Sequence, residues 1–240
     1  MKLSIIIPVY NEENTIAEIL KKIKSVKLPS RINKEIIVVD DGSNDASILE
    51  VKKAMINLKI RDLKLIRHAT NMGKGSAIRT GIKKATGGII IIQDADLEYN
   101  PNDYTRLLEP ILNGKSKVVY GSRLKHYPLR ISGSKKTPLI THYLGNKLLT
   151  LFTNILYGNG VTDMETCYKV FKKEVIKDVN INAKRFDFEP EITAKILKRG
   201  FKIHEIPIKV KPRGYEEGKK ISWKDGFVAV WTLLKYRFID

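Results

Sequence analysis

The sequence predicts an α/β protein with a doubly wound, mostly parallel sheet flanked by helices, and three observations lead to this class. Five short apolar runs, rich in β-branched residues, recur in the first half of the chain. The segments between them carry apolar residues at helical spacing. Such alternation is typical of parallel sheets covered on both faces. With 240 residues and an apolar fraction of 42%, the chain is also long enough to bury a full core.

The first half supplies five predicted strands with helices between them. The strands are the runs Leu3–Val9, Glu35–Val39, Leu63–Ile66, Gly88–Ile92 and Lys117–Tyr120. Helical spacing is clear at Ile16, Ile19, Leu20 and Ile23, and again at Ile48, Val51 and Met55. Successive strands are therefore expected to pair in parallel.

The second half departs from this alternation. Residues 122–138 are polar, basic and rich in Ser, Gly and Pro, the composition of a loop. Two helices are predicted next, with two short strands, over Leu139–Tyr157, Cys167–Phe171, Glu189–Leu197 and Lys202–Lys209. A last helix, Ser222–Phe238, places apolar residues on one face: Trp223, Phe227, Val230, Trp231 and Leu234. We therefore expect a main domain over residues 1–210. Residues 211–240 form a basic loop and an amphipathic helix that packs on this domain or extends it.

The formal net charge of +18 is the strongest feature of the composition. It is compatible with phosphorylated ligands, an anionic membrane surface, nucleic acid or a solvated Lys-rich surface. A nucleic-acid-binding protein needs a basic stripe, or aromatic residues interleaved with Lys and Arg. The basic residues are instead spread through most of the chain. We therefore predict no nucleic-acid partner.

Cysteine content and hydropathy bear on the compartment. Cys167 is the only cysteine, which excludes an intramolecular disulfide and suits a reducing compartment. The four histidines are scattered, so the sequence has no zinc-type cluster. No segment resembles a signal peptide, and no apolar run reaches about 18 residues. We expect a cytoplasmic protein that lies on a membrane without crossing it.

Acidic side chains follow three of the predicted strands. Glu12 and Glu13 come after the first strand, Asp41 after the second, and the segment Asp94-Ala95-Asp96-Leu97-Glu98 after the fourth. The carboxyl ends of parallel strands lie at one edge of a sheet, where open α/β sheets bind their ligands. The sequence therefore predicts a cluster of carboxylates at this edge.

Asp94 and Asp96 have the spacing and chemistry of a divalent-cation site. Two carboxylates can share a cation and leave its other positions open to substrate phosphates. The alternative is a cap for the helix that follows Pro101. A phosphatase that forms an aspartyl phosphate also uses Asp-x-Asp, but it usually has Thr or Val where Glu98 stands. A receiver-type phosphorylation domain would be about half this length. Neither this domain nor the phosphatase explains the second half of the chain.

Two further loops follow strands. Asp41-Gly42-Ser43 is either a turn with a helix cap or a site where Asp41 accepts hydrogen bonds from a nucleobase or ribose. In Asn71-Met72-Gly73-Lys74-Gly75, the glycines and the following helix favour a bound anion, and a plain turn at the start of that helix is the alternative. The spacing of a Walker P-loop is missing.

Together these motifs resemble glycosyltransferases of family 2, which have the GT-A nucleotide-sugar fold, and above all the dolichyl-phosphate mannose synthase and polyprenyl-phosphate glycosyltransferase branch. The resemblance covers almost the whole chain, and its motifs are specific in their order and spacing. They are Pro8-Val9-Tyr10-Asn11-Glu12-Glu13, Val39-Asp40-Asp41-Gly42-Ser43, Asn71-Met72-Gly73-Lys74-Gly75, Asp94-Ala95-Asp96-Leu97-Glu98, Gly121-Ser122-Arg123, Asp163-Met164-Glu165-Thr166-Cys167-Tyr168-Lys169, Phe188-Glu189-Pro190-Glu191 and Arg213-Gly214-Tyr215-Glu216-Glu217-Gly218-Lys219-Lys220.

The resemblance implies a role for each matching residue. The nucleoside would be held by Pro8, Tyr10, Glu12 and Asp41. Arg213 and Lys219 would approach the donor diphosphate, and Lys74 and Ala95 would also take part in binding the donor. A Mg²⁺ or Mn²⁺ ion would bind Asp94, Asp96 and Glu98. Arg123 matches a position that contacts phosphate. Asp163 begins a motif that usually reads Asp-x-x-Thr-Gly, and Cys167 replaces its Gly.

The implied reaction is an inverting displacement at the anomeric carbon of a GDP- or UDP-hexose, with mannose or glucose as the sugar. The acceptor would be a polyprenyl phosphate (dolichyl or undecaprenyl), whose oxygen is already anionic and needs no general base. Arg123 with Arg130, Lys135 and Lys136 would hold the acceptor phosphate, although a solvated loop is an equal alternative for the last three.

A lipid acceptor requires contact with a bilayer. The helices Leu139–Tyr157 and Ser222–Phe238 each have an apolar face, and the second combines two Trp with Lys and Arg, as interfacial helices do. The alternative is that both pack on the sheet, which we expect for the first. An anionic membrane surface is thus a predicted partner on the cytoplasmic face. Two other functions stay open, namely a family 2 transferase with a soluble or cell-envelope glycan acceptor and a non-enzymatic basic binding module.

Overall fold

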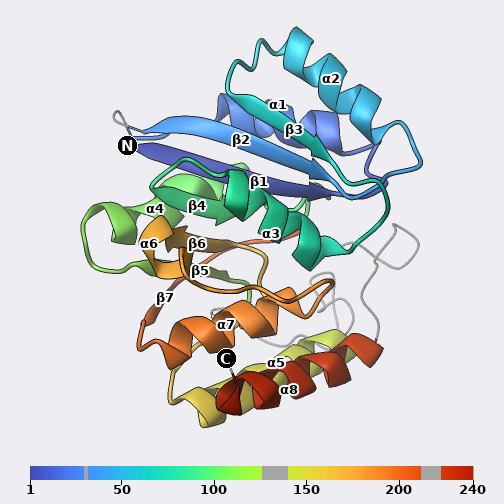
Figure 1. The fold of residues 1–240 in the computed structure, drawn as a ribbon. Helices are drawn as coiled ribbons and strands as arrows, with labels where there is room; N and C mark the ends of the chain where they lie inside the picture. Colours follow the sequence, from blue (N-terminus) through green and yellow to red (C-terminus); the bar gives the residue numbers. More distant parts are fainter. Residues whose placement is uncertain (30–31, 126–139, 212–222, 240) are drawn as a thin grey trace.

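The computed structural model describes residues 1–29, 32–125, 140–211 and 223–239 (Figure 1). In this part of the chain seven strands form one sheet in the order β3-β2-β1-β4-β6-β5-β7. They are β1 (Lys2–Val9), β2 (Asn33–Asp40), β3 (Leu63–Arg67), β4 (Ile89–Ile92), β5 (Val118–Ser122), β6 (Lys169–Lys172) and β7 (Ile203–Pro207). The prediction of a mostly parallel sheet flanked by helices is confirmed.

The register shows where the parallel pattern stops. Ile5 of β1 pairs with Ile36 of β2 on one side and Ile91 of β4 on the other, in parallel on both sides. β6 then runs antiparallel to both β4 and β5, whereas β5 and β7 are parallel. The strand predicted over Cys167–Phe171 is β6. It begins two residues later than predicted, at Lys169, and it is antiparallel to both neighbouring strands. The sequence of so short a strand does not indicate whether it pairs in parallel or antiparallel.

Eight α-helices of the described residues surround the sheet, together with the short 3₁₀ turn η1 (Pro101–Asp103). They are α1 (Ile16–Ser25), α2 (Ser47–Asn57), α3 (Lys74–Lys84), α4 (Tyr104–Leu112), α5 (Ile140–Tyr157), α6 (Lys173–Ile176), α7 (Phe188–Lys198) and α8 (Trp223–Phe238). α3 packs on β1 and β2, and α4 on β5, β6 and β7. A Cβ at Gly81 of α3 would come within 2.4 Å of Ile6, so a glycine is needed for this close packing.

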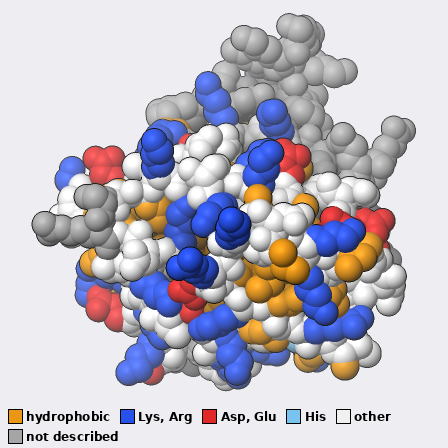
Figure 2. Space-filling model, turned by 90° about the horizontal axis from the view of Figure 1, so that it is seen from above, with side chains coloured by type: hydrophobic (Ala, Val, Ile, Leu, Met, Phe, Trp, Pro, Cys, Tyr) orange, Lys and Arg blue, Asp and Glu red, His pale blue; other side chains and the backbone are white. Residues whose placement is uncertain are grey.

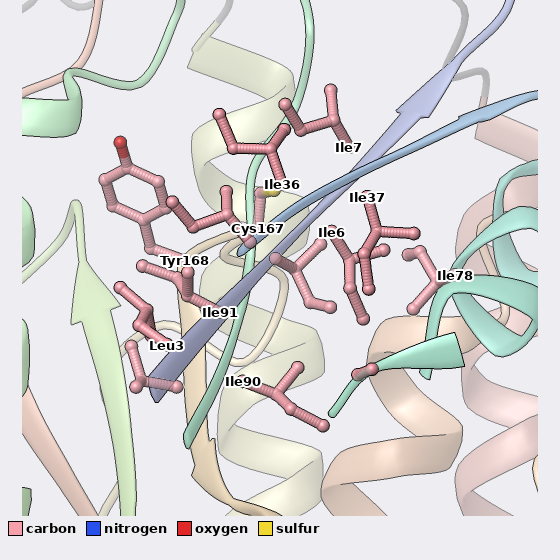
Figure 3. Close-up of a cluster of buried hydrophobic side chains, with 14 of the residues drawn as sticks. Leu3, Ile6, Ile7, Ile36, Ile37, Ile78, Ile90, Ile91, Cys167 and Tyr168 are labelled. Atoms are coloured by element: carbon pink, nitrogen blue, oxygen red, sulfur yellow. The ribbon is translucent and has the colours of Figure 1, made fainter. Parts of the chain in front are cut away.

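The core lies between these layers and is built largely from isoleucine. Figure 3 shows side chains of β1, β2 and β4 packed against one another, among them Leu3, Ile6, Ile37 and Ile90. Cys167 is buried in the same cluster. The cysteine that stands in the Asp-x-x-Thr-Gly motif is therefore a core residue, and burial together with the nearby charge of Asp94 raises the pKa of its thiol.

A second, smaller apolar cluster holds α5, α7 and α8 together, and we call these three helices the C-terminal helical layer. Its buried members are Val161, Met164, Ala194, Leu233 and Tyr236. α5 and α8 lie side by side against α7, at the end of the molecule farthest from α2 (Figure 1). No helix in the described ranges has the length and apolar character needed to cross a membrane.

The structure corrects the expectation that α5 packs on the sheet. α5 contacts α7 and α8, and its spaced apolar residues point outward, with Leu148 67% exposed. The face predicted for α8 is also exposed at Phe227 and Trp231, whereas Leu233 and Tyr236 are buried. Helical spacing identified an apolar stripe on each helix but not the side that packs against protein.

Basic residues cover much of the surface without forming a single stripe. On the face shown in Figure 2, Lys and Arg side chains are scattered among polar and apolar patches, with acidic side chains between them. The positive charge is therefore distributed on that face.

Candidate active site

Two loops at the carboxyl ends of β1 and β2 are joined by reciprocal hydrogen bonds. The backbone N–H of Asn11 donates to Ser43 Oγ (3.0 Å), and the N–H of Asn44 donates to Asn11 Oδ1 (2.9 Å). Glu12 N–H donates to Ser47 Oγ (2.8 Å). Asn11 takes a left-handed φ of 53°, which Asn tolerates better than most residues. These bonds fix the segment that contains Tyr10 and Glu12, beside Pro8 at the end of β1.

Asp41 is the centre of the second loop and is almost fully buried, at 2% exposure. Its Oδ1 lies 2.7 Å from His68 Nδ1 and accepts the N–H of Met72 (3.0 Å). Its Oδ2 accepts the N–H of Gly73 (2.6 Å). Asp41 therefore holds the loop after β3 in place. An ionised carboxylate has about four acceptor positions, so capacity for a further donor remains.

The glycine-containing turn before α3 packs against the protein's own backbone. A Cβ at Gly73 would come within 2.2 Å of the carbonyl oxygen of Lys184, and one at Gly75 within 2.8 Å of that of Ala183. The N–H of Gly75 donates to the carbonyl of Arg185 (3.2 Å), at the start of α3. This geometry favours the turn over a free anion site at the helix terminus. The Lys74 side chain nevertheless reaches the acidic edge.

The Asp94-Ala95-Asp96 turn follows β4 closely and is held in place by hydrogen bonds of the preceding residue, Gln93. Gln93 Oε1 accepts the hydroxyls of Tyr104 (2.7 Å) and Tyr168 (2.8 Å), and Gln93 Nε2 donates to the carbonyl of Asp94 (2.9 Å). Leu97 then takes a left-handed φ of 63°, which is strained for a bulky residue. Such strain is common at functional turns.

Lys74 bridges two carboxylates at this edge. Its Nζ lies 3.0 Å from Asp94 Oδ1 and 3.0 Å from Glu189 Oε1, the latter at the start of α7. Burial lowers the pKa of Lys74, but the charges of Asp94 and Glu189 outweigh it and hold the pKa well above its ordinary value. The ammonium is therefore charged at the acidic edge.

The donor set at Asp94 and Asp96 fits a cation that shares its coordination with a ligand. Among the described residues no three His, Cys, Asp or Glu side chains gather as a closed metal site. Two hard oxygen donors with open positions are what Mg²⁺ takes when substrate phosphates supply other ligands. Asp96 Oδ1 also accepts the N–H of Glu98 (3.1 Å), which orients that carboxylate.

Arg123 lies at the end of β5 and is held by Asp163. Its Nε and Nη2 donate to the two oxygens of Asp163 at 2.8 Å each, and its backbone N–H adds a third bond at 2.8 Å. Asn146 of α5 donates to Asp163 Oδ1 (3.0 Å). Burial raises the pKa of Asp163, but Arg123 and these bonds lower it further, so the carboxyl stays ionised. The pair uses two of the five guanidinium N–H donors and leaves three for a phosphate.

Tyr99 connects the two parts of this edge. Burial raises its pKa, and the charges of Arg123 and Asp94 both act on its hydroxyl, which accepts the N–H of Cys167 (3.1 Å). The charges of Asp94 and Arg123 therefore both reach the Tyr99 hydroxyl.

Three charged residues of the site were not assigned a role from the sequence: Glu165, Lys169 and Glu189. Burial raises the pKa of Glu165 to about 7, and the charge of Glu189 adds to this rise, while Lys169 and Arg123 oppose it. Burial lowers the pKa of Lys169 to about 8, and its Nζ donates to the carbonyl of Met164 (2.8 Å). Glu165 and Glu189 belong to recognised motifs, but the sequence does not show that the two motifs meet.

Part of the predicted site lies outside the described residues: Arg213, Lys219, Arg130, Lys135 and Lys136. The chain enters one of these segments close to the acidic turn, because the N–H of Lys211 donates to the carbonyl of Glu98 (3.0 Å). Tyr99 also forms an isolated antiparallel bridge with Val210.

Known proteins resemble this chain over most of its length. The family model described as Glycosyl transferase family 2 matches residues 4–179. The UDP-N-acetylglucosamine–dolichyl-phosphate N-acetylglucosaminyltransferase of Methanococcus voltae is 31% identical over 245 residues, covering 96% of this chain and 94% of that protein. The low-salt glycan biosynthesis hexosyltransferase Agl6 of Haloferax volcanii is 27% identical, covering 97% of this chain. The chain spans only 53% of Agl6.

Solved structures share the fold. Glucosyl-3-phosphoglycerate synthase of Mycobacterium tuberculosis, crystallised with Mn²⁺, UDP and phosphoglyceric acid, superimposes with a TM-score of 0.71 at 19% identity. The match covers all of this chain and 79% of the other. At this identity the similarity is one of fold, that of a GT-A-like α/β sheet.

Proposed function

Because the chain belongs to glycosyl transferase family 2, we propose that it is an inverting glycosyltransferase with a polyprenyl phosphate acceptor. The donor is a nucleoside-diphosphate sugar, UDP- or GDP-linked. The sugar is a hexose such as mannose or glucose, or an N-acetylhexosamine like that named for the M. voltae relative. Dolichyl or undecaprenyl phosphate would receive it.

One observation carries the choice of a lipid acceptor. Of the thirteen large apolar side chains that are exposed among the described residues, eight belong to α5 and α8. These eight form what we call the apolar face: Leu144, Leu148, Leu151, Ile155, Phe227, Val228, Trp231 and Phe238. Since α5 and α8 contact each other as well as α7, their outer sides adjoin. An apolar area of this kind, with Lys and Arg nearby, suits the surface of an anionic membrane.

The apolar face is connected to the site by α5 itself. The helix that exposes Leu148 also supplies Asn146, which bonds Asp163 and through it holds Arg123. A protein seated on a bilayer through α5 and α8 would keep Arg123 near the membrane surface, where a lipid phosphate lies. The single buried cysteine suits the cytoplasmic side of that membrane.

In the proposed reaction, the anionic oxygen of the acceptor phosphate attacks the anomeric carbon and the nucleoside diphosphate leaves. Asp94 and Asp96 would hold a Mg²⁺ or Mn²⁺ ion, which neutralises charge on the leaving diphosphate when bound. Lys74, which lies beside Asp94, would contact the diphosphate, and Arg123 would hold the acceptor phosphate in line. No general base is required, because the acceptor carries no proton to remove.

A transfer assay tests the proposal. The purified protein is incubated with Mn²⁺, dolichyl phosphate and one radiolabelled donor at a time (UDP-glucose, UDP-N-acetylglucosamine, GDP-mannose), and label is counted in the lipid phase. We expect one donor to label the lipid and a chelator to stop the transfer. In a parallel reaction a glycan with free hydroxyl groups replaces dolichyl phosphate. Label that enters only this glycan, or no label with any donor, would contradict the proposal.

A further inference from the structure

A segment from a distant part of the sequence supports the start of α3. The N–H of Gly75 donates to the carbonyl of Arg185 (3.2 Å), and the N–H of Ser76 donates to the carbonyl of Lys184 (3.1 Å). Both N–H groups belong to the first turn of α3, where backbone donors have no partner within the helix. Residues 180–187, which we call the α7 entry loop, therefore cap α3 with their own backbone.

The α7 entry loop and α3 are in close contact at two further points. Arg79 of α3 donates to the carbonyl of Ile181 (3.0 Å). A Cβ on Gly73 would lie 2.2 Å from a carbonyl oxygen of the loop, so the two segments have no room to approach further. A displacement of the loop is therefore expected to displace the next residue, Lys74, whose Nζ lies 3.0 Å from Asp94 Oδ1.

Glu191 of α7 holds the loop from its other side. One of its carboxylate oxygens accepts the N–H of Asn182 (2.8 Å), and the other accepts the N–H of Ala183 (2.5 Å). Lys195, one turn further along α7, donates to the first of these oxygens (2.5 Å) and to the carbonyl of Asn180. Glu191 is only 1% exposed. Because charge-assisted bonds are strong where water is excluded, this carboxylate fixes the loop firmly.

Tyr236 of α8 holds the same arrangement from the C-terminal helical layer. Its ring centroid lies 4.1 Å from Lys195 Nζ, and its hydroxyl accepts a hydrogen bond from Asn182 Nδ2 (3.4 Å). A cation over an aromatic ring is attracted to the face of that ring. Lys195 is therefore fixed between Tyr236 and Glu191, so its ammonium stays beside the carboxylate that holds the loop.

We propose that Glu191 is a positioning residue for donor binding, which it supports by fixing the α7 entry loop and, through it, the place of Lys74 at the acidic edge. This inference rests on the proposed function, in which Lys74 contacts the donor diphosphate. Both carboxylate oxygens of Glu191 are bonded to the loop, so its effect on a ligand passes through the loop. Loss of Glu191 should therefore weaken binding of the nucleotide and leave the acceptor phosphate at Arg123 unaffected.

A double-mutant cycle tests this role. The affinities of UDP and GDP with Mn²⁺ are measured by calorimetric titration for the wild type, Glu191→Gln, Lys74→Met and the double variant. The amide of Glu191→Gln has one acceptor oxygen instead of two, so the loop loses a bond. We expect each single variant to weaken binding of the accepted nucleotide about tenfold, as for loss of a hydrogen bond to a charged group.

The double variant distinguishes positioning from a separate effect. If Glu191 acts through Lys74, adding Glu191→Gln to Lys74→Met should weaken binding less than twofold further. Fully additive losses would overturn the proposal. In the transfer assay, the KM for the donor should rise in Glu191→Gln while the KM for dolichyl phosphate stays within twofold of the wild type. Equal rises in both KM values would also overturn it.

Glu35→Gln is the matched control. Glu35 is also buried, contacts the ammonium of Lys64 (2.6 Å) and accepts the N–H of Thr86 (2.9 Å). It lies near the amino end of β2, the opposite end of that strand from Asp41. This variant should lower the melting temperature and leave nucleotide affinity unchanged. Equal weakening in Glu35→Gln and Glu191→Gln would mean that Glu191 contributes only to stability.

A second variant covers the case in which Glu191→Gln does not fold. Lys195→Met removes the ammonium that holds the same carboxylate, and it should weaken nucleotide binding while Glu35→Gln does not. Unchanged affinity in the folded variants of Glu191 and Lys195 would overturn the positioning role. Failure of the wild type to bind either nucleotide would overturn the proposed function, and this inference with it.

Discussion

The strands β1, β2 and β4 with the loops that follow them, which we call the donor half, and the C-terminal helical layer use apolar residues in opposite ways. In β1, β2 and β4 almost every apolar side chain is buried in the isoleucine core, and polar side chains begin where the strands end. In α5 and α8, by contrast, long apolar residues such as Leu148 and Trp231 are exposed, while others, such as Leu233 and Tyr236, make the contacts within the layer. The first region is complete within the chain, whereas the second presents a surface suited to a partner.

The two regions also differ in how they hold charge. Around Asp41 the polar groups are joined to backbone N–H groups of neighbouring loops, which makes a rigid frame. Asp94 is paired with Lys74 and Arg123 with Asp163, and within the described ranges one carboxylate oxygen each of Glu165 and Glu189 has no donor. Rigid frames suit binding of a constant group such as a nucleoside. Unsatisfied charges suit groups that change during a reaction.

The largest effect should come from the acidic edge of the donor half. Asp96→Asn removes one of two carboxylates that would hold the cation, so charge on the leaving diphosphate is no longer neutralised. We expect transfer to fall by about 1,000-fold or more, the scale of losing a main electrostatic contact in a transition state. Metal-dependent nucleotide binding should weaken while the melting temperature stays close to that of the wild type. Ordinary turnover at normal Mg²⁺ would remove Asp96 from the site.

A smaller effect is expected on membrane binding when the exposed apolar residues of α5 and α8 are replaced. The double variant Leu148→Ser, Trp231→Ser takes two large side chains from the apolar face, each worth about 1.5–3 kcal/mol when fully buried in an apolar medium. Co-sedimentation with anionic vesicles should fall about 100-fold, whereas stability should change little because both side chains are exposed.

The control for the vesicle experiment lies on α2. Leu49 and Ile56 are exposed large apolar residues outside the C-terminal helical layer. Leu49→Ser, Ile56→Ser should leave vesicle binding unchanged. If both double variants lost vesicle binding equally, membrane contact would not be specific to α5 and α8. The exposed apolar residues of these helices would then not form a distinct membrane-binding surface.

The smallest expected effect is on how the stability of the protein depends on pH, and it concerns Glu165. Since the pKa of Glu165 rises from about 4.5 to about 7 on folding, the native state binds this proton more tightly than the unfolded chain does. The stabilisation is present below pH 4.5 and is lost as the pH rises to about 7. Glu165→Gln lacks this loss, so its stability relative to the wild type should rise by on the order of 2 kcal/mol over that window.

Denaturant unfolding at several pH values from 4.5 to 7.5 measures this difference. Lys169 acts in the opposite sense, because its pKa is lowered to about 8 and its effect appears only as the pH rises through 8. Titration of Lys169 therefore does not contribute to the stability change between pH 4.5 and 7. Parallel stability curves for wild type and variant below pH 7.5 would show that Glu165 keeps an ordinary pKa in the folded protein.

Much of the donor half followed from local patterns. The β-branched runs indicated the strands, and the alternation with helices indicated parallel pairing, which the register of Ile5 with Ile36 and Ile91 confirms. Asp94 and Asp96 were placed at the correct edge because the carboxyl ends of parallel strands lie together. The antiparallel direction of β6 was not predictable, since a strand of four residues carries no directional signal.

The sequence by itself determined the class of fold, the family and the acidic edge, because periodicity and motif spacing are properties of short stretches of chain. Only the tertiary structure decided which side of α5 and α8 faces protein, because an apolar stripe does not identify its partner. It also decided that Lys74 joins Asp94 to Glu189, and that the charges of Glu189 and Arg123 both act on Glu165. These residues come from distant parts of the sequence, and only folding brings their charges within reach of one another.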